Sequence, residues 1–302
     1  MSDNTKGKIS VMIAMLIFGT VGIFSKQVAL PSGAVALARS LIGLIFLAVF
    51  MLFIKKRLSF SAIKRNLLLL IASGICLGLN WLLFFAACRE TTVPTATLAY
   101  YLAPVFMTIG SFLVYKEKLT VVRAVSVAIA LFGMVLASGV LEGGAEGVTI
   151  FGIALGAIAA VIYAAIVLMN KGMKDIDSLD KTVCQFAVAS LLLLPYTLII
   201  EKPSLAAVDI KCIGMLLVIG IIHTGAAYAL YFGSIGKLSA VSVGMLGYID
   251  PVVSILVSVM LFSEPLSVGA LIGALLIIGA SAASELIRAS SPKKEKELSD
   301  EN

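Results

Sequence analysis

Charged residues are scarce in this chain of 302 residues: lysine, arginine, aspartate and glutamate together make up 13%. Soluble domains carry about a quarter charged residues. Hydrophobic residues make up 60% of the chain, and the mean hydropathy is +1.09. A water-soluble core of this length could not bury so much apolar surface, so the composition predicts an integral membrane protein.

Residues that build metal and redox sites are also few. The single histidine excludes a multi-histidine metal site, and the four cysteines form no CxxC pair. We expect the cysteines to be small apolar packing residues. HExxH, G-x-S-x-G, a paired aspartate cluster and a Walker A loop are missing as well. These absences argue against an enzyme, a cofactor or a metal, and against direct driving by ATP.

Long apolar runs dominate what is present. Ten of them approach the roughly 20 residues that a transmembrane helix needs. They cover about 9–26, 32–54, 67–88, 94–115, 121–140, 148–170, 180–200, 211–234, 239–262 and 268–287. The polar start "MSDNTKGK" leads into the first run without an A-x-A-like cleavage site, so we expect a span there rather than a signal peptide. The sequence thus predicts an all-α integral membrane fold of ten transmembrane helices, with residues 288–302 as a disordered cytoplasmic tail.

Most of the 23 lysines and arginines fall on one side of these spans. Placing the N-terminus in the cytoplasm leaves outside only Lys26, Arg39, Arg89, Lys202 and Lys211. The positive-inside rule therefore predicts a multi-pass protein of the cytoplasmic membrane with both termini inside. The net charge of +6 is explained by basic residues beside anionic lipid, and no nucleic-acid partner is expected.

The two halves of the chain resemble each other. The segment "WLLFFAACRETTVPTATLAYYLAPV" (81–105) aligns without a gap on "YALYFGSIGKLSAVSVGMLGYIDPV" (228–252), at an offset of 147. At this offset Gly78 matches Gly225, Tyr101 matches Tyr248, Pro104 matches Pro251 and Glu117 matches Glu264; at an offset of 145, Gly7 matches Gly152 and Lys26 matches Lys171. Each half holds five spans, and because five is odd the second half must enter the membrane inverted. Residues 1–141 and 142–287 are therefore predicted to form two inverted five-helix repeats, an arrangement typical of transporters.

Both copies carry the marks of a known family. "LAYYLAPVFMTIGSFLVYKEKLT" places a proline ahead of a glutamate and a following Leu-Thr, and the second copy reads "GYIDPVVSILVSVMLFSEPLS". Over about 9–287, the chain resembles the paired EamA domains of the drug/metabolite transporter superfamily. The resemblance implies a ten-helix bundle around a central cavity. It also implies substrates such as amino acids, other small metabolites, nucleotide-derived compounds or drugs, often moved outward.

Polar residues without a polar counterpart in the other half are the candidates for a substrate site. A residue matched in both halves is expected to serve the shared scaffold, whereas an unmatched residue can select a substrate. The unmatched residues are Asp250 (opposite Ala103), His223 (opposite Cys76), Asn80 (opposite Ala227) and Arg39 (opposite Cys184).

Asp250 is the most unusual of these residues. It lies about ten residues into its span, which at ~1.5 Å per residue places it near the middle of the bilayer. A lone charge there costs at least ~2.5–3.5 kcal/mol, so the carboxyl must be paired, hydrated or protonated. We predict that it faces a central cavity and binds a substrate amine or a coupling proton. The alternative is a protonated carboxyl that donates to a backbone carbonyl freed by Pro251.

Arg39 and His223 are the other ionisable candidates. Arg39 lies ~10 Å deep, where its guanidinium could hold a substrate carboxylate. The alternatives are a side chain that reaches back to the outer interface, or an internal salt bridge. His223 could carry a proton or donate to substrate, or be a neutral ring bonded to a neighbouring helix.

Aromatic and proline residues complete the predicted site. Asn80, Trp81, Tyr101 and Tyr248 could line an amphipathic cavity whose rings stack on an apolar or cationic group, with ordinary helix packing as the alternative. Pro104 and Pro251 each remove a backbone hydrogen bond, so they are predicted either to bend during transport or to be static kinks.

Together these patterns predict a secondary transporter, acting as an exporter of small metabolites such as amino acids, that works by alternating access. An acid near the midplane and an arginine further out would suit a zwitterion. The alternatives are a drug or lipid-intermediate exporter, or a membrane sensor without transport. Because one chain holds both halves, a monomer already supplies the symmetry, and a homodimer is the other option. The expected partners are a small-molecule substrate, the lipid bilayer and, as an open option, a coupling proton.

Overall fold

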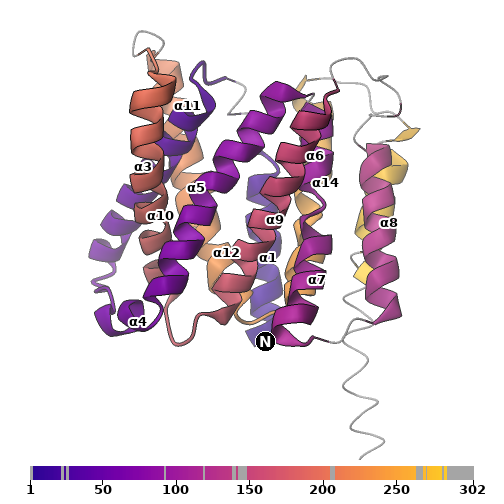
Figure 1. Ribbon diagram of the computed structural model, residues 1–302, viewed down its shortest axis with the longest axis horizontal. Coiled ribbons are helices and arrows are strands. Elements are labelled where there is room, and N and C mark those ends of the chain that lie inside the picture. The colour runs from indigo at the N-terminus through magenta and orange to yellow at the C-terminus, as the bar shows by residue number, and fades with distance from the viewer. Residues whose placement is uncertain are drawn as a thin grey trace, which may run out of the picture.

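The computed structural model describes residues 3–21, 24, 27–91, 93–117, 120–137, 141, 148–204, 208–262, 268–269, 271–280 and 282–283. These residues form helices joined by turns and loops, and the helices stand side by side along one direction (Figure 1). The all-α membrane fold is therefore confirmed. The predicted tail at 288–302 lies outside the described residues, and so does most of the loop around Glu264.

The first half contains seven described helices that are used below. They are α1 (Asp3–Phe18), α3 (Ser32–Phe53), α4 (Phe60–Arg65), α5 (Leu67–Glu90), α6 (Val93–Tyr100), α7 (Ala103–Tyr115) and α8 (Val121–Ala137). The second half contains α9 (Ile150–Gly172), α10 (Ser178–Pro195), the π-helix η1 (Tyr196–Glu201), α11 (Ile210–Val218), the π-helix η3 (Ile219–Ala226), α12 (Ala227–Ile235), α13 (Ala240–Gly247) and α14 (Ile249–Phe262).

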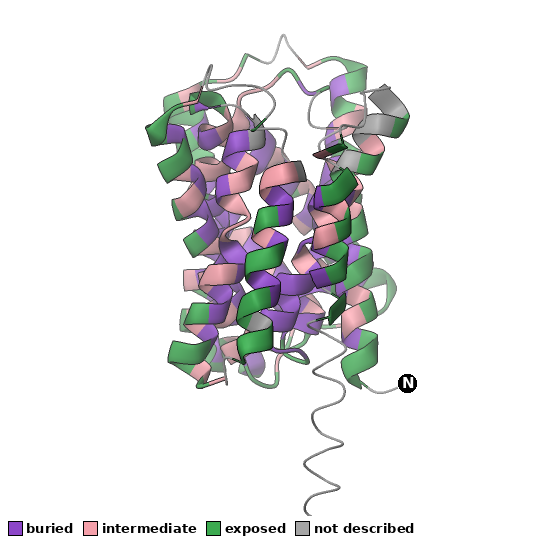
Figure 2. Cartoon of the chain, turned by 90° about the vertical axis from the view of Figure 1, so that its right-hand side faces the viewer, coloured by how far each residue is buried: buried purple, intermediate pink, exposed green. Residues whose placement is uncertain are grey.

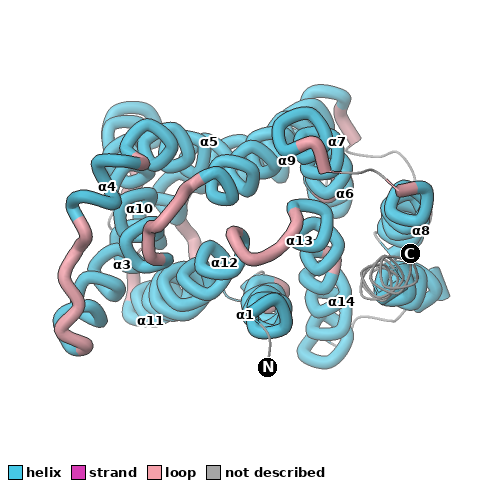
Figure 3. Tube along the Cα trace, turned by 90° about the horizontal axis from the view of Figure 1, so that it is seen from below, coloured by secondary structure: helices cyan, strands magenta, loops and turns pink. Residues whose placement is uncertain are grey.

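Six of the described helical segments are long and apolar enough to cross a membrane, and shorter apolar helices supplement them. Their outer faces carry exposed apolar side chains such as Phe53, Leu68 and Met260, and buried residues lie between the helices (Figure 2). Seen from below, α1 and α12 lie between a group formed by α3, α10 and α11 and a group formed by α13 and α14 (Figure 3). Such an arrangement suits lipid outside and helix packing inside.

Contacts repeat between the two halves. Gly7 packs against Leu238, and its counterpart Gly152 packs against Thr91, which lies 147 residues before Leu238. In the same way α1 packs on α12, and α9 packs on α5. Two glycines that are 145 residues apart thus meet partners that are 147 apart, as expected of two copies of one fold.

Two of the predicted spans are broken at equivalent positions. The span expected at 94–115 is divided into α6 and α7, and the one at 239–262 is divided into α13 and α14. Pro104 is the second residue of α7, and Pro251 is the third residue of α14. Proline is tolerated in a first helical turn because the N–H groups there have no partner within the helix. The prolines therefore begin new helices rather than kink continuous ones.

A π-helix distinguishes the second half from the first. In α5, Gly74 and Gly78 are four residues apart and pack against Val188 and Leu192. Their counterparts Gly220 and Gly225 are five residues apart and pack against Ile42 and Phe46 on α3. An α-helix returns to the same face after about four residues and a π-helix after five. One extra residue in η3 therefore keeps both glycines against the neighbouring helix.

These glycine contacts also correct the expected counterpart of Arg39. Ile42 and Val188 occupy equivalent places and are 146 residues apart, as are Phe46 and Leu192. On α10 this offset pairs Arg39 with Gln185, not with Cys184. The offset cannot be found from the sequence here because α3 and α10 share few identical residues.

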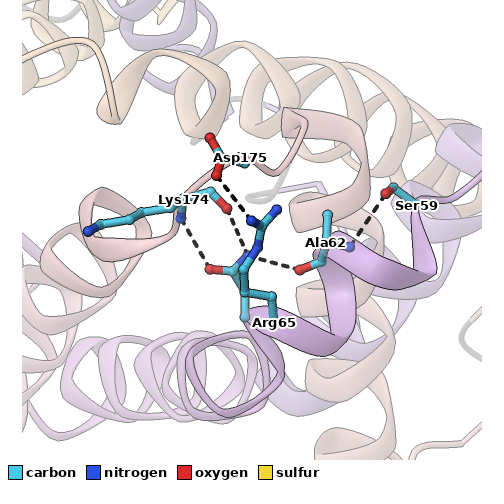
Figure 4. A network of polar contacts seen from close by, with 6 residues as sticks. Ser59, Ala62, Arg65, Lys174 and Asp175 are labelled. Carbon is cyan, nitrogen blue, oxygen red and sulfur yellow. Dashed lines mark hydrogen bonds and ion pairs between the residues drawn. The ribbon is translucent and has the colours of Figure 1, made fainter.

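A network at one end of the bundle ties α4 to the turn after α9 (Figure 4). Arg65 forms an ion pair of 3.2 Å with Asp175, and Ala62 N–H donates to the Ser59 hydroxyl at 3.4 Å. The Asn66 side chain donates to the Lys174 carbonyl at 3.0 Å and accepts from the Lys174 N–H at 3.1 Å. The ion pair is exposed to solvent, so we assign this network to the scaffold.

Candidate functional site

Arg39 is held inside the bundle by α3. Its side chain is only 7% exposed, its Nε donates to the Thr224 hydroxyl at 3.0 Å, and its guanidinium lies 4.7 Å from the centre of the Trp81 ring. Thr224 in turn donates to the Ile219 carbonyl five residues earlier at 2.8 Å, a bond that follows the π-helix. Among the described residues no carboxylate lies within ion-pair distance of Arg39. The side chain therefore neither reaches back to an interface nor forms a salt bridge there.

Trp81 and Tyr228 mark the pseudo-twofold axis between the halves. They are counterparts at an offset of 147, and the Trp81 ring N–H donates to the Tyr228 hydroxyl at 3.1 Å. Tyr101 and Tyr248 are also counterparts, and the Tyr248 hydroxyl donates to the Tyr101 carbonyl at 3.4 Å. Residues exchanged by a twofold rotation can touch only if both lie beside its axis. The arginine thus stacks on a ring beside the axis.

A cluster of tyrosines continues from this point. Tyr100 stacks on Tyr163 with ring centres 5.6 Å apart, and the Tyr163 and Tyr231 hydroxyls are 2.7 Å apart. Asn80 fixes the cluster, because its oxygen accepts from the Tyr100 hydroxyl at 3.3 Å and its nitrogen donates to the Ala159 carbonyl at 2.7 Å. Such hydroxyl and ring surfaces can contact both polar and apolar parts of a ligand.

Asp250 lies in the first turn of α14, near Tyr100, Tyr101 and Tyr163. The side chain is half-buried, and its carboxyl lies within hydrogen-bonding reach of the Tyr101 hydroxyl. Tyr228 lies near both Arg39 and Asp250, and so does Tyr100. Among the described residues no cation forms an ion pair with Asp250. A guanidinium and a carboxyl group therefore lie near one tyrosine cluster, and no ion pair joins them.

His223 takes a different position from the one expected of a substrate ligand. It is buried in η3, with Nε2 2.9 Å from the Thr20 hydroxyl and Nδ1 3.3 Å from the Val218 carbonyl. Both ring nitrogens thus contact protein atoms, and Asp250 is not one of the partners.

An ion pair also joins the ends of α7 and α9. Lys171 pairs with Glu117 and lies 5.1 Å from the centre of the Tyr115 ring. The side chains are 18% and 17% exposed, so this pair is much less hydrated than Arg65–Asp175. It connects the end of the first half's broken span to the first helix of the second half.

A separate pocket of about 270 Å³ lies between α3 and α10. It is lined by Leu41, Leu44, Ala187, Ser190, Leu191 and Leu194. Because this lining has no charged group, we do not place a polar ligand there. The described residues also contain no group of three or more His, Cys, Asp or Glu side chains that could hold a metal ion.

Sequence reasoning missed five residues of this arrangement. They are Tyr100, Tyr163, Thr224, Tyr228 and Tyr231. The signal that could have found the tyrosines is their place in the middle of apolar spans, where a hydroxyl needs a partner. Thr224 had no such signal, since a threonine can bond within its own helix.

Comparison with known proteins gives consistent results. The model of the EamA-like transporter family matches residues 5–139 and again residues 150–284. "Uncharacterized transporter YxxF" of Bacillus subtilis is 33% identical over 251 residues, which cover 82% of this chain and 79% of that protein. An "Uncharacterized transporter" of Clostridium kluyveri is 27% identical, covering 70% of this chain and 68% of its own. A solved crystal structure with 19% identity matches at a TM-score of 0.82 over 94% of this chain and 97% of that one, which shows a shared fold.

Proposed function

The chain belongs to the EamA-like transporter family, and on that premise we propose that it is a secondary transporter of small zwitterionic metabolites, such as amino acids, in the cytoplasmic membrane. The repeated fold and the transporter relatives support the transporter class. The substrate class is argued below from the charged groups. We expect net export, the direction common among the proteins that the sequence resembles.

The observation that carries the proposal is the guanidinium of Arg39, which is buried and has no carboxylate partner among the described residues. A buried charge is costly unless it is paired and hydrogen-bonded. Within the described part of the chain its contacts are the stacking on Trp81 and one bond to Thr224, which leave most of its N–H groups available. A substrate carboxylate would supply the missing charge and can accept two parallel N–H bonds from the fork.

Asp250 supports the second half of the proposal. A substrate amine beside this carboxyl would balance its charge, just as the carboxylate balances Arg39. Tyr100 and Tyr228 interact with both charged groups, so one short zwitterion lying over these rings could reach the two together. Asn80, Trp81, Tyr101 and Tyr248 then serve as lining or supporting residues.

Alternating access would use the breaks next to Pro104 and Pro251. Each break lies beside a tyrosine at the pseudo-twofold axis, so the outer and inner parts of the two spans can tilt separately around the site. The Lys171–Glu117 pair would close one end and separate when the site opens there. With the basic loops cytoplasmic, both termini lie inside, and a monomer suffices because it contains both halves.

One observation favours a second candidate, an exporter of drugs or lipid intermediates. The tyrosine rings near Asp250 could hold an apolar cation, since aromatic faces attract cations. That function would require Asp250 and the rings but not Arg39.

Counterflow in proteoliposomes tests the proposal, with a panel of amino acids, amines and carboxylates. The proteins compared are the wild type, Arg39→Gln, Asp250→Asn and, as control, Arg89→Gln at the exposed end of α5. We expect one amino acid to exchange, with loss in the first two variants and none in the control. Exchange of amines that survives Arg39→Gln would favour the second candidate. If none of the compounds is transported, the remaining candidate is a membrane sensor without transport.

A further inference from the structure

We propose that His223 is a proton-binding site whose occupancy is linked to that of Arg39, so that a proton and an anionic group bind together. The inference rests on the proposed function only in taking the anion to be a substrate carboxylate. Its basis is the hydrogen bonding of one imidazole ring.

Three hydrogen bonds are made at or next to the His223 ring: Nδ1 with Val218, Nε2 with Thr20, and Thr20 with Ile17. Together they need more protons than a neutral ring and the Thr20 hydroxyl can supply. The Val218 carbonyl can only accept, so Nδ1 must carry a proton to bond it. The Thr20 hydroxyl donates its single proton to the Ile17 carbonyl at 2.8 Å, so it can only accept from Nε2. A neutral ring has one N–H and must give up one of these contacts, whereas the imidazolium satisfies all three. The Phe24 ring, 5.0 Å away between centres, offers a further surface that suits a cation.

The positive charge of Arg39 disfavours protonation of His223. It interacts electrostatically with His223 and is bonded to the next residue, Thr224. On α14, Asp250 meets the end of α1 at Gly19 through its backbone carbonyl, while its carboxyl faces Tyr101. On α12, Tyr228 is directed to Trp81. When an anion neutralises Arg39, the repulsion falls and the ring can take up its proton.

The consequence is linkage between proton and substrate. Since each ligand favours binding of the other by the same factor, a carrier with this site carries both together, and net export of the substrate would take the proton outward with it. The proton also joins the end of α1 to the π-helix through Thr20 and Val218. When the proton is lost, one of the three contacts must break: the bond to Val218, the bond to Thr20, or the Thr20 bond to Ile17.

The test uses the fact that His223 is the sole histidine of the chain. The full-length protein, purified with a histidine-free tag and labelled with isotopic histidine, is titrated by NMR in lipid nanodiscs. We expect Arg39→Gln to raise the midpoint of ring protonation by about one pH unit or more. Arg39→Lys, which keeps the charge, should stay close to the wild type. Thr20→Val should lower the midpoint.

Equal midpoints in the wild type and Arg39→Gln would overturn the proposal, and so would an unchanged midpoint in Thr20→Val. A second arm replaces sodium chloride with sodium acetate as a simple carboxylate. Acetate should raise the midpoint in the wild type and not in Arg39→Gln. If acetate has no effect while Arg39→Gln does, the proton site stands and the carboxylate specificity of the proposed function fails.

Discussion

The two halves share their packing and differ in their charges. Gly74 meets Val188 as Gly220 meets Ile42, so the same close approach of helices occurs twice. Arg39, however, corresponds to Gln185, and Asp250 corresponds to Ala103. The shared contacts build two similar bodies, while each of these two ionisable residues occurs in only one of them. Asymmetry within a symmetric scaffold thus places one basic and one acidic residue near the tyrosine cluster.

A symmetric site would have been costly. An arginine at position 185 as well would add a second buried positive charge, and among the described residues no carboxylate forms an ion pair even with Arg39. Gln185 keeps the position polar without adding charge, and its Nε2 donates to Ser73 at 2.6 Å. The difference teaches that substrate selection can change in one half while the packing of both halves is retained.

The largest difference is expected between deleting one residue from the π-helix η3 and deleting one from its α-helical counterpart in α5. Deleting Ile75 from α5 should rotate Gly78 by about 100° around the helix relative to Gly74 and prevent folding. Deleting Ile222 from η3 should instead restore an α-helical spacing of the glycines, and the protein should still fold. Both residues are partly exposed, at 38% and 46%, so neither deletion removes a core side chain. Size-exclusion profiles and thermal unfolding check this; similar behaviour of both deletions would refute the comparison.

The rate of substrate exchange should depend much more on Arg39 than on Gln185. We expect Arg39→Gln to lower carboxylate-dependent flux by about 30-fold or more, because a buried charge pair contributes about 2–5 kcal/mol when one partner is removed. Gln185→Leu should change the flux only a few-fold, since Gln185 bonds to Ser73 rather than to a ligand. Initial rates in proteoliposomes measure both. Equal losses would mean that the two positions contribute alike.

A methyl group added between packed helices should lower the stability of the protein by the same amount in either half. A β-carbon at Gly220 would lie 2.4 Å from Ile42 Cβ, and one at Gly74 would lie 2.7 Å from Val188 Cβ. Gly220→Ala and Gly74→Ala should each cost about 1–3 kcal/mol through overpacking. Gly247→Ala is the matched control, because nothing lies within 4 Å of a β-carbon there. A lower thermal midpoint in only one of the two tight variants would contradict their equivalence.

The smallest effect is expected at the surface. Arg65 and Asp175 have side chains that are 56% and 76% exposed, so Arg65→Gln should cost at most about 1 kcal/mol. Lys171→Gln should lower the thermal midpoint more, since its pair with Glu117 is shielded from water. A larger shift for Arg65→Gln would show that the network in Figure 4 matters more than the contact between the halves.

Hydropathy and repetition alone determined the membrane class and the two related halves, because both are properties of the sequence along one dimension. Of the ten predicted spans, six are long enough to cross a membrane among the described helices. The search for polar residues without a counterpart also singled out Arg39 and Asp250, since a charge in an apolar run is costly wherever the helices pack. His223 was found in the same way, but its partners Thr20 and Val218 were not.

Only the tertiary structure decided which groups meet. Arg39 lies 185 residues from Thr224, and Trp81 lies 147 residues from Tyr228. The extra residue in η3 and the pairing of Arg39 with Gln185 became visible only through glycine contacts with another helix. Helical periodicity sets the face on which a side chain lies, but not the helix that it faces. That choice depends on close packing between segments far apart in the chain, where small residues let backbones approach.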